Sequence, residues 1–304
     1  MSLYLKHRPT CFEEIIGNEN VVSAIKALLQ DKQNTPHSFL LHGETGCGKT
    51  TLARIIAKEL GCKGDDYCEI NASDVRGIDM VREIIRQSQF MPLEGSCRVW
   101  VIDEAHKLTN EAMNAMLKIL EDTPKHVYFI LCTTETQKLL PTIRGRCSQF
   151  QMKPLNEKQM IGLLRRICKK ENERLETEIL EQIAQDSLGH PRNALQILEQ
   201  VLAVAPEQRL SMAQQVAEEQ SQVIELCRAL MRRAGWKEIA LILSGLSEQD
   251  PESIRRAVLG YCTSVLLKES NIQAGRILEN FENNFYDIGR PGLVLACYRI
   301  IEGE

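Results

Sequence analysis

The sequence has 304 residues, enough for two or three domains that each bury a hydrophobic core. Hydrophobic residues make up 43% and charged residues 26%, which excludes the disordered and fibrous classes. A net charge of −4 excludes an overall basic coat for nucleic-acid binding but allows a local basic face. No apolar run approaches the roughly 18 residues of a membrane helix, and the first ten residues lack a signal-peptide core. We therefore expect a soluble intracellular protein with no membrane partner.

The sequence contains 11 cysteines and no Cys-x-x-Cys pair. Cys62 and Cys68 do not have the spacing of a zinc ribbon. Because the count is odd and no export signal is present, we expect reduced thiols packed as small hydrophobic side chains, and no zinc.

Up to about residue 155, short apolar runs alternate with helical patterns, which is typical of a parallel sheet with crossover helices. The predicted strands are Ser38–His42, Tyr67–Asn71, Arg98–Asp103, Val127–Cys132 and Ser148–Met152. Beyond residue 155 only helical patterns follow, with apolar residues three and four positions apart. We predict an α/β domain over 1–154, a small helical domain over 155–205 and a second helical domain over 206–304.

The segment Gly43-Glu-Thr-Gly-Cys-Gly-Lys-Thr50 matches the phosphate-loop pattern GxxxxGK[ST] completely. A predicted strand leads into it and a predicted helix, Thr51–Leu60, leads out of it, which disfavours the alternative of a glycine-rich turn without function. Backbone N–H groups of such a loop surround phosphates, and the helix N-terminus adds a positive dipole. We expect Lys49 to reach the β- and γ-phosphates and the Thr50 hydroxyl to bind Mg²⁺. The expected nucleotide-binding residues of the loop are Gly43, Glu44, Thr45, Gly46, Cys47, Gly48, Lys49, Thr50 and Thr51.

Two acidic residues follow a buried apolar strand in the segment Val99-Trp-Val-Ile-Asp103-Glu104-Ala-His106. Asp103 lies at the carboxyl end of the strand, where open α/β sheets bind ligands, and it is expected to hold Mg²⁺ through water. Glu104 is positioned to orient and deprotonate the attacking water, which predicts hydrolysis as well as binding. The alternative is a solvated acidic turn, and the phosphate loop earlier in the chain argues against it.

Two weaker features point to the γ-phosphate. Thr133 and Thr134 end the fourth predicted strand, and Gly189-His-Pro-Arg192 opens a helix. A threonine at a strand end is commonly a turn former, and an arginine on a helix is commonly solvated, so neither feature carries weight alone.

Together these motifs resemble the AAA+ clamp-loader ATPases, the bacterial gamma/tau-type subunit and the small subunit of replication factor C. The resemblance extends over most of the chain. The matching segments are Lys6-His-Arg-Pro9, Phe12-Glu-Glu-Ile-Ile-Gly17, Glu69-Ile-Asn-Ala-Ser-Asp-Val-Arg-Gly-Ile78, Asp103-Glu-Ala-His106, Cys132-Thr-Thr-Glu-Thr-Gln-Lys138, Gly145-Arg-Cys147 and Gly189-His-Pro-Arg192.

The resemblance implies roles for individual residues. Arg8, Pro9 and Ile16 would lie at the adenine, and ATP would be the nucleotide. Thr134 would be the first sensor, Arg192 the second sensor from a helical lid, and Arg146 an arginine finger acting on a neighbouring subunit's ATP. The expected catalytic set is Lys49, Asp103, Glu104, Thr134, Arg146 and Arg192.

The resemblance also implies partners. The C-terminal helices would form a collar in a five-subunit ring, and the sliding clamp and primer-template DNA would be the other partners. Arg76, Arg82, Lys107 and Thr109 would follow the DNA backbone inside the ring, which reconciles an acidic chain with a DNA partner. Such a protein works in the cytoplasm of a bacterial or phage-infected cell, or in the nucleus of a eukaryote.

Three departures from the family pattern stand in this sequence. No four-cysteine zinc module separates the phosphate loop from Tyr67, and His7 and Gly145 replace commoner residues. We also expect no tau-like tail after Glu304. The leading interpretation is the ATP-driven motor subunit of a clamp loader. The alternatives are a structural loader subunit that does not hydrolyse ATP, another AAA+ ATPase that remodels DNA, and a helicase of the DEAH type, which would need two recombinase-like lobes.

Overall fold

The computed structural model describes residues 2–31, 34–75, 77–247, 249–267, 270–285 and 288–302. The chain divides into two compact units, residues 1–203 and 204–304. The division lies close to the boundary predicted near Pro206, whereas the one predicted near residue 154 falls inside the first unit, so the three-domain description stays a prediction. No helix among the described residues combines the length and the apolar character needed to span a membrane.

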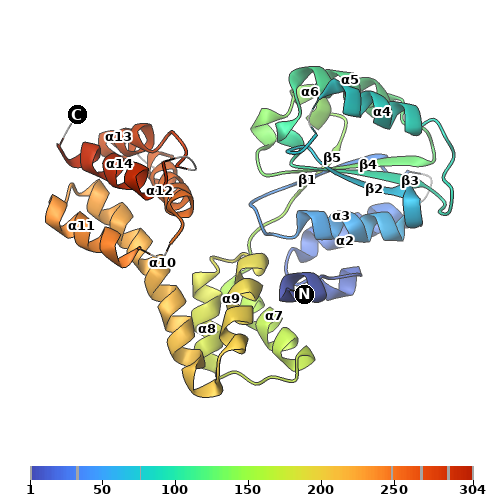
Figure 1. Ribbon diagram of the computed structural model, residues 1–304. Helices are drawn as coiled ribbons and strands as arrows, with labels where there is room; N and C mark the ends of the chain where they lie inside the picture. The colour runs from blue at the N-terminus through green and yellow to red at the C-terminus, as the bar shows by residue number, and fades with distance from the viewer. Residues whose placement is uncertain are drawn as a thin grey trace. The chain divides into compact units, whose positions relative to one another are not determined.

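The first unit contains a five-stranded parallel sheet with strand order β2-β3-β4-β1-β5 (Figure 1). This confirms the predicted α/β fold class. The fourth strand is one residue longer and the fifth one residue shorter than predicted. The strands are β1 (Ser38–His42), β2 (Tyr67–Asn71), β3 (Arg98–Asp103), β4 (Val127–Thr133) and β5 (Ser148–Gln151).

Helices cover both faces of the sheet, because alternate residues of its central strands point to opposite faces. Phe39 and Leu41 of β1 pack in the core beneath one face, together with the apolar stripes of α2 and α3. Leu40 of β1 packs on the other face, with residues of α4, α5 and α6. The helices of this region are α1 (Leu3–Lys6), α2 (Glu19–Gln30), α3 (Lys49–Glu59), α4 (Ile78–Gln87), α5 (Asn110–Glu121) and α6 (Pro141–Arg144).

Three helices complete the first unit: α7 (Glu157–Lys170), α8 (Thr177–Asp186) and α9 (Pro191–Ala203). Asn156 begins α7 with a capping box, since its side chain accepts the N–H of Gln159 over 2.9 Å and the Gln159 side chain accepts the N–H of Asn156. The N-terminal segment is tied to these helices. Lys6 forms an ion pair with Glu171, His7 forms a hydrogen bond with the same carboxylate, and Ser2 donates a hydrogen bond to Glu199 over 2.9 Å.

The second unit is helical throughout its described residues, as the sequence pattern predicts. Its core includes Leu226, Ile239, Val258, Phe281 and Leu293. Its helices are α10 (Arg209–Met231), α11 (Trp236–Gly245), α12 (Pro251–Leu266), α13 (Ile272–Asn280) and α14 (Arg290–Glu302).

Candidate nucleotide-binding site

The phosphate loop connects β1 to α3, and its glycines adopt backbone conformations that other residues rarely reach. Gly43, Gly46 and Gly48 have φ angles of 145°, 83° and 94°. A Cβ on Gly43 would lie 2.1 Å from the carbonyl oxygen of Met152, so this position has no room for a side chain. Helix α3 begins at Lys49, two residues earlier than predicted, which brings the loop directly onto a helix N-terminus.

Lys49 is folded back over the loop. Its Nζ donates hydrogen bonds of 2.9 Å to the carbonyl oxygens of Gly43 and Glu44, and the residue is only 6% exposed. These two loop residues therefore contribute backbone oxygens that hold the lysine, and neither lines the adjacent cavity. An ammonium group held in this way is prepared to bind phosphate oxygens as a point charge.

The carboxyl ends of the strands bring the polar residues together. Asn71 pairs in register with Asp103 on the neighbouring strand, and the Thr50 hydroxyl donates a 2.7 Å hydrogen bond to Oδ2 of Asp103. A hydroxyl and a carboxylate in contact at a phosphate loop are the oxygen donors that Mg²⁺ prefers. The residues therefore fit the predicted metal pair, Thr50 and Asp103.

Glu104 has a left-handed backbone, with φ 50°, immediately after β3. Its N–H donates to Oδ1 of Asp103 over 2.9 Å, and its carboxylate accepts a long, 3.5 Å hydrogen bond from the hydroxyl of Thr134. Thr134 thus contacts the predicted base and does not line the cavity. A positive φ at a residue other than glycine is uncommon, and at functional sites it re-aims a side chain.

A cavity of about 320 Å³ lies over the loop, between the sheet, the N-terminal segment and helices α7 and α9. Four of its side chains are basic: Arg8, Lys49, Arg166 and Arg192. The remaining wall mixes polar side chains with apolar ones such as Ile16, Leu163 and Leu195, and the apolar part suits a base above a chain of phosphates. The lining residues outside the loop are Tyr4, His7, Arg8, Pro9, Glu14, Ile15, Ile16, Asn18, Asn71, Asp103, Glu104, Met152, Leu155, Leu163, Arg166, Pro191, Arg192 and Leu195.

Arg8 lies close to other positive charges. Burial lowers the pKa of Arg8, and the neighbouring guanidinium groups of Arg54 and Arg192 lower it further, while Glu69 and Tyr4 oppose the shift. The guanidinium carbon of Arg192 lies 5.8 Å from the ring centre of Tyr4, in a cation–π contact. Positive charges held close together in this way favour a polyanionic ligand such as a nucleoside triphosphate.

The remaining predicted residues lie elsewhere. Arg146 does not line the cavity, and its guanidinium binds Glu121 over 2.9 Å and the carbonyl oxygen of Thr142 over 3.1 Å. Its finger role stays a prediction.

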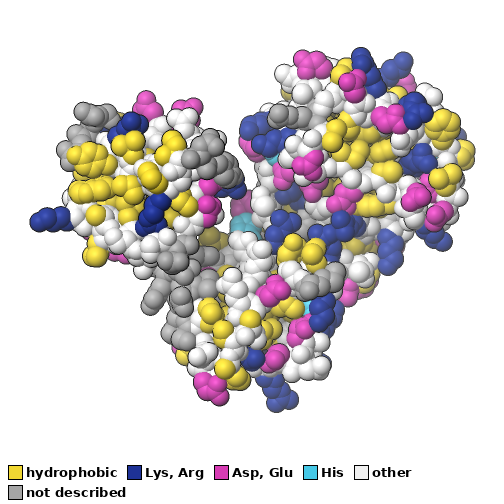
Figure 2. Space-filling view, viewed as in Figure 1, with side chains coloured by type: hydrophobic (Ala, Val, Ile, Leu, Met, Phe, Trp, Pro, Cys, Tyr) yellow, Lys and Arg dark blue, Asp and Glu magenta, His cyan; other side chains and the backbone are white. Residues whose placement is uncertain are grey.

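Of the four predicted DNA contacts, Arg76 lies outside the described residues. Arg82 of α4 forms a 3.0 Å ion pair with Asp79, Lys107 ends the short 3-10 helix Ala105–Lys107, and Thr109 caps α5 by accepting the N–H of Ala112. On the face seen in Figure 2 basic and acidic side chains are interspersed, in keeping with the small net charge. DNA binding by these residues stays a prediction.

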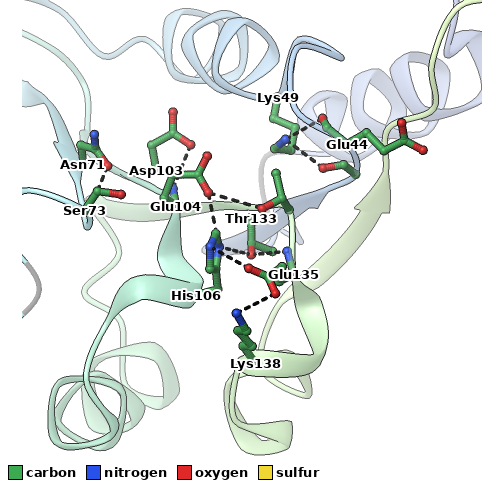
Figure 3. Close-up of polar contacts among 12 residues, drawn as sticks. Glu44, Lys49, Asn71, Ser73, Asp103, Glu104, His106, Thr133, Glu135 and Lys138 are labelled. Atoms are coloured by element: carbon green, nitrogen blue, oxygen red, sulfur yellow. Dashed lines mark hydrogen bonds and ion pairs between the residues drawn. The ribbon is translucent and has the colours of Figure 1, made fainter. Parts of the chain in front are cut away.

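The sequence patterns missed two groups of site residues. The first is the far wall of the cavity, including Tyr4, Arg166 and Leu163, whose helical spacing marks them only as ordinary amphipathic positions. The second is the set of side chains behind Glu104, drawn in Figure 3. Here His106 lies 3.3 Å from Glu104, 3.0 Å from Thr133 and 3.3 Å from Glu135. Burial lowers the pKa of His106, and the two glutamates oppose this shift.

The family models match parts of this chain, whereas the sequence relatives extend over most of it. Residues 65–156 match the family model of the DNA polymerase III delta subunit, and residues 15–90 match the model of the sigma-54 interaction domain. The chain is 35% identical over 228 residues to the gamma/tau subunit of DNA polymerase III from Mycobacterium tuberculosis H37Rv, covering 67% of this chain and 39% of the relative. It is 31% identical over 261 residues to the tau subunit from Escherichia coli K12, covering 78% of this chain and 40% of the relative.

The chain thus spans about two fifths of the length of these relatives. Among solved structures, the Holliday junction branch migration motor RuvB of Thermotoga maritima has a TM-score of 0.62 at 22% identity, covering 78% of this chain and 85% of that one. At this identity the likeness concerns the fold alone. The sequence relatives carry the assignment, and the chain belongs to the gamma/tau clamp-loader subunit family of DNA polymerase III, with an AAA+ fold.

Proposed function

We propose that this chain is the ATP-hydrolysing motor subunit of a DNA sliding-clamp loader. ATP binding and hydrolysis would drive opening of the clamp and its placement on primer-template DNA during replication. The observation that carries the proposal is the contact of Thr50 with Asp103, with Glu104 next to it above a complete phosphate loop. The gamma/tau relatives reported above come from bacteria and support the replication setting and a cytoplasmic place of action.

The residues suggest how the hydrolysis would proceed. When bound, Mg²⁺ would be held by Thr50 and Asp103 and would neutralise phosphate charge. Lys49 binds the phosphates, Glu104 accepts a proton from the attacking water, and Arg192 reaches the phosphates from α9. A guanidinium in the neighbouring subunit at the position of Arg146 would complete the site, which makes assembly a condition for full activity.

The structural-subunit alternative predicts a chain that lacks the hydrolytic residues or holds them apart. Here Asp103 and Glu104 lie together at the end of β3, and Glu104 is within reach of Thr134. The DEAH-type helicase alternative needs a second strand-helix lobe, and the described residues of the second unit are helical. The arrangement therefore favours the motor subunit.

An exposed apolar loop supports a protein partner. Phe90, Met91 and Leu93 are 59%, 68% and 76% exposed in the segment between α4 and β3. The buried carboxylate of Asp66 holds this segment by accepting the N–H groups of Leu93, Glu94 and Gly95, each over 2.8 Å. Adjacent apolar side chains held in solvent by a fixed backbone are typical of a binding surface.

The test is ATP turnover by the purified chain, alone and with primer-template DNA and a bacterial sliding clamp added separately and together. We expect slow basal hydrolysis that rises when DNA and clamp are both present. ATP binding without turnover in any of these mixtures would favour the structural subunit, and a chain that does not bind ATP would refute the proposal. Replacing Phe90, Met91 and Leu93 with serine should abolish the stimulation by the clamp and leave basal turnover unchanged.

A further inference from the structure

His106 occupies the space directly behind the predicted catalytic base. It belongs to the short 3-10 helix Ala105–Lys107 and its side chain is only 3% exposed. Figure 3 shows the imidazole between the carboxylates of Glu104 and Glu135, with Lys138 beyond Glu135. A neutral imidazole has one N–H, so it donates toward only one of its two carboxylate neighbours.

The two ring nitrogens have different partners. Nδ1 lies 3.0 Å from the Thr133 hydroxyl and 3.3 Å from Oε2 of Glu104, whereas Nε2 lies 3.3 Å from Oε1 of Glu135. The outer carboxylate is held in turn, because Lys138 binds Glu135 over 2.8 Å and the N–H of Glu135 donates to the Thr133 hydroxyl over 3.0 Å. The charged groups that face the ring are therefore Glu104, Glu135, Lys138 and the neighbouring Lys107.

The arrangement connects two strand ends. Glu104 follows β3, and Thr133 ends β4, which lies beside β3 in the sheet. Thr134 contacts the same carboxylate oxygen, Oε2 of Glu104, that faces Nδ1. Glu104 also has a left-handed backbone, so its side-chain direction depends on contacts beyond the strand. Of these side-chain contacts, His106 is the buried one.

We propose that His106 is a positioning residue for Glu104: its Nδ1–H, directed between the Thr133 hydroxyl and Oε2 of Glu104, fixes the Glu104 carboxylate, and Thr133 fixes the ring. The inference rests on the proposed hydrolytic function, in which Glu104 accepts the proton of the attacking water. The histidine itself does not line the nucleotide cavity and takes no part in proton transfer to substrate. Its effect is to reduce the freedom of the base, so that water and carboxylate meet in the reactive geometry.

The two edges of the ring can be tested separately. The amide of asparagine reaches the position of Nδ1, and the amide of glutamine reaches the position of Nε2. We expect His106→Ala and His106→Gln to lower kcat by about ten- to hundredfold, with the KM for ATP changed less than about twofold. His106→Asn, which keeps a donor toward Glu104, should retain most of the activity.

His37 provides a matched control, because it contacts β4 at the end opposite Thr133. Nδ1 of His37 bonds the carbonyl oxygen of Val127, the first residue of β4, over 2.7 Å, and its ring stacks on Tyr128. His37→Gln disturbs β4 without touching Glu104 and should leave kcat unchanged. Equal losses in the alanine, asparagine and glutamine variants of His106, or parental turnover in all of them, would overturn the proposal.

A second measurement needs no ATPase activity and therefore separates this proposal from the proposed function. The chain has two tryptophans, and in a Trp236→Phe background the fluorescence of buried Trp100 on β3 reports unfolding of the first unit. A double-mutant cycle combines His106→Ala with Glu104→Gln. We expect the unfolding constant of the double variant to differ about twofold or more from the product of the single effects. Independent effects would overturn the proposal, whereas coupling in a chain that hydrolyses no ATP would refute only the proposed function.

Discussion

The Thr50 hydroxyl donates a 2.7 Å hydrogen bond to Oδ2 of Asp103, and this contact joins the first turn of α3 to the end of β3. It brings the phosphate loop and the acidic strand end, which are far apart in the sequence, to one point. Two oxygen donors in contact at a phosphate-binding loop form a site suited to Mg²⁺.

Thr50→Ala should remove one of these donors. We expect the gain in ATP affinity that Mg²⁺ provides to fall by at least about tenfold, whereas ATP affinity measured in EDTA changes little. Thr50→Ser keeps the hydroxyl and is the matched control. Calorimetric titration with and without Mg²⁺ measures both affinities, and an unchanged Mg²⁺ effect in Thr50→Ala would assign the metal to other ligands.

Glu104→Gln should separate binding from hydrolysis. The amide cannot accept a proton from water, so we expect turnover to fall by a factor on the order of 10² to 10⁴ while ATP affinity stays near that of the parent. Steady-state ATPase rates and a nucleotide-binding titration give the two quantities. A variant that hydrolyses ATP at the parental rate would show that another residue is the base.

Variants of Arg146 can show whether a neighbouring subunit completes the ATP site. Its guanidinium is outside the cavity and pairs with Glu121, so we expect it to act on ATP in a neighbouring subunit. Arg146→Ala should bind ATP normally and hydrolyse it poorly in the complex, and mixing it with the inactive Lys49→Ala chain should restore part of the activity. Glu121→Gln breaks the same ion pair and retains the arginine, so it should stay active. Equal defects in Arg146→Ala and Glu121→Gln would identify the pair as structural.

The predicted DNA surface can be measured through its salt dependence. Replacing Arg76 and Arg82 with alanine should weaken primer-template binding equally for all sequences and lower the slope of log affinity against log salt by roughly two. Arg86 pairs with Glu83 on the same helix as Arg82 and provides the control, Arg86→Ala. An unchanged slope in the double variant would place the DNA elsewhere.

Asp66 makes the stability of the first unit depend on pH. Burial opposes its ionisation, but the N–H groups of Leu93, Glu94 and Gly95 and the Arg98 guanidinium outweigh burial and lower its pKa to about 2. Because the pKa is lower in the folded than in the unfolded chain, the stabilisation is present above about pH 4 and is lost as the pH falls toward 2.

Asp66→Asn should therefore destabilise the first unit by about 2 kcal/mol at neutral pH, with a difference that shrinks in acid. Denaturant unfolding followed by Trp100 fluorescence across this range measures it, with Asp65→Asn, a neighbouring exposed position, as control. A difference that does not depend on pH would assign the effect of Asp66 to packing.

The sequence alone determined the parallel sheet and indicated which polar residues stand at its edge. Short apolar runs between helical patterns located the five strands of the sheet to within one residue. The spacing of Gly43, Lys49 and Thr50 specified a phosphate loop. These features are local, because a strand and its following turn are encoded by neighbouring residues. Asp103 and Glu104 were found in the same way, from their position directly after a strand.

The walls of the site depended on the tertiary structure. Tyr4 and Arg192 lie near opposite ends of the first unit in the sequence but are in contact at the cavity. No sequence periodicity connects them. His106 was part of a recognised motif, yet its partners Thr133 and Glu135 come from another strand end, so its place behind Glu104 could not be read from spacing. The physical reason is that hydrogen bonds and ion pairs between distant segments depend on the sheet order, which decides which strand ends lie side by side.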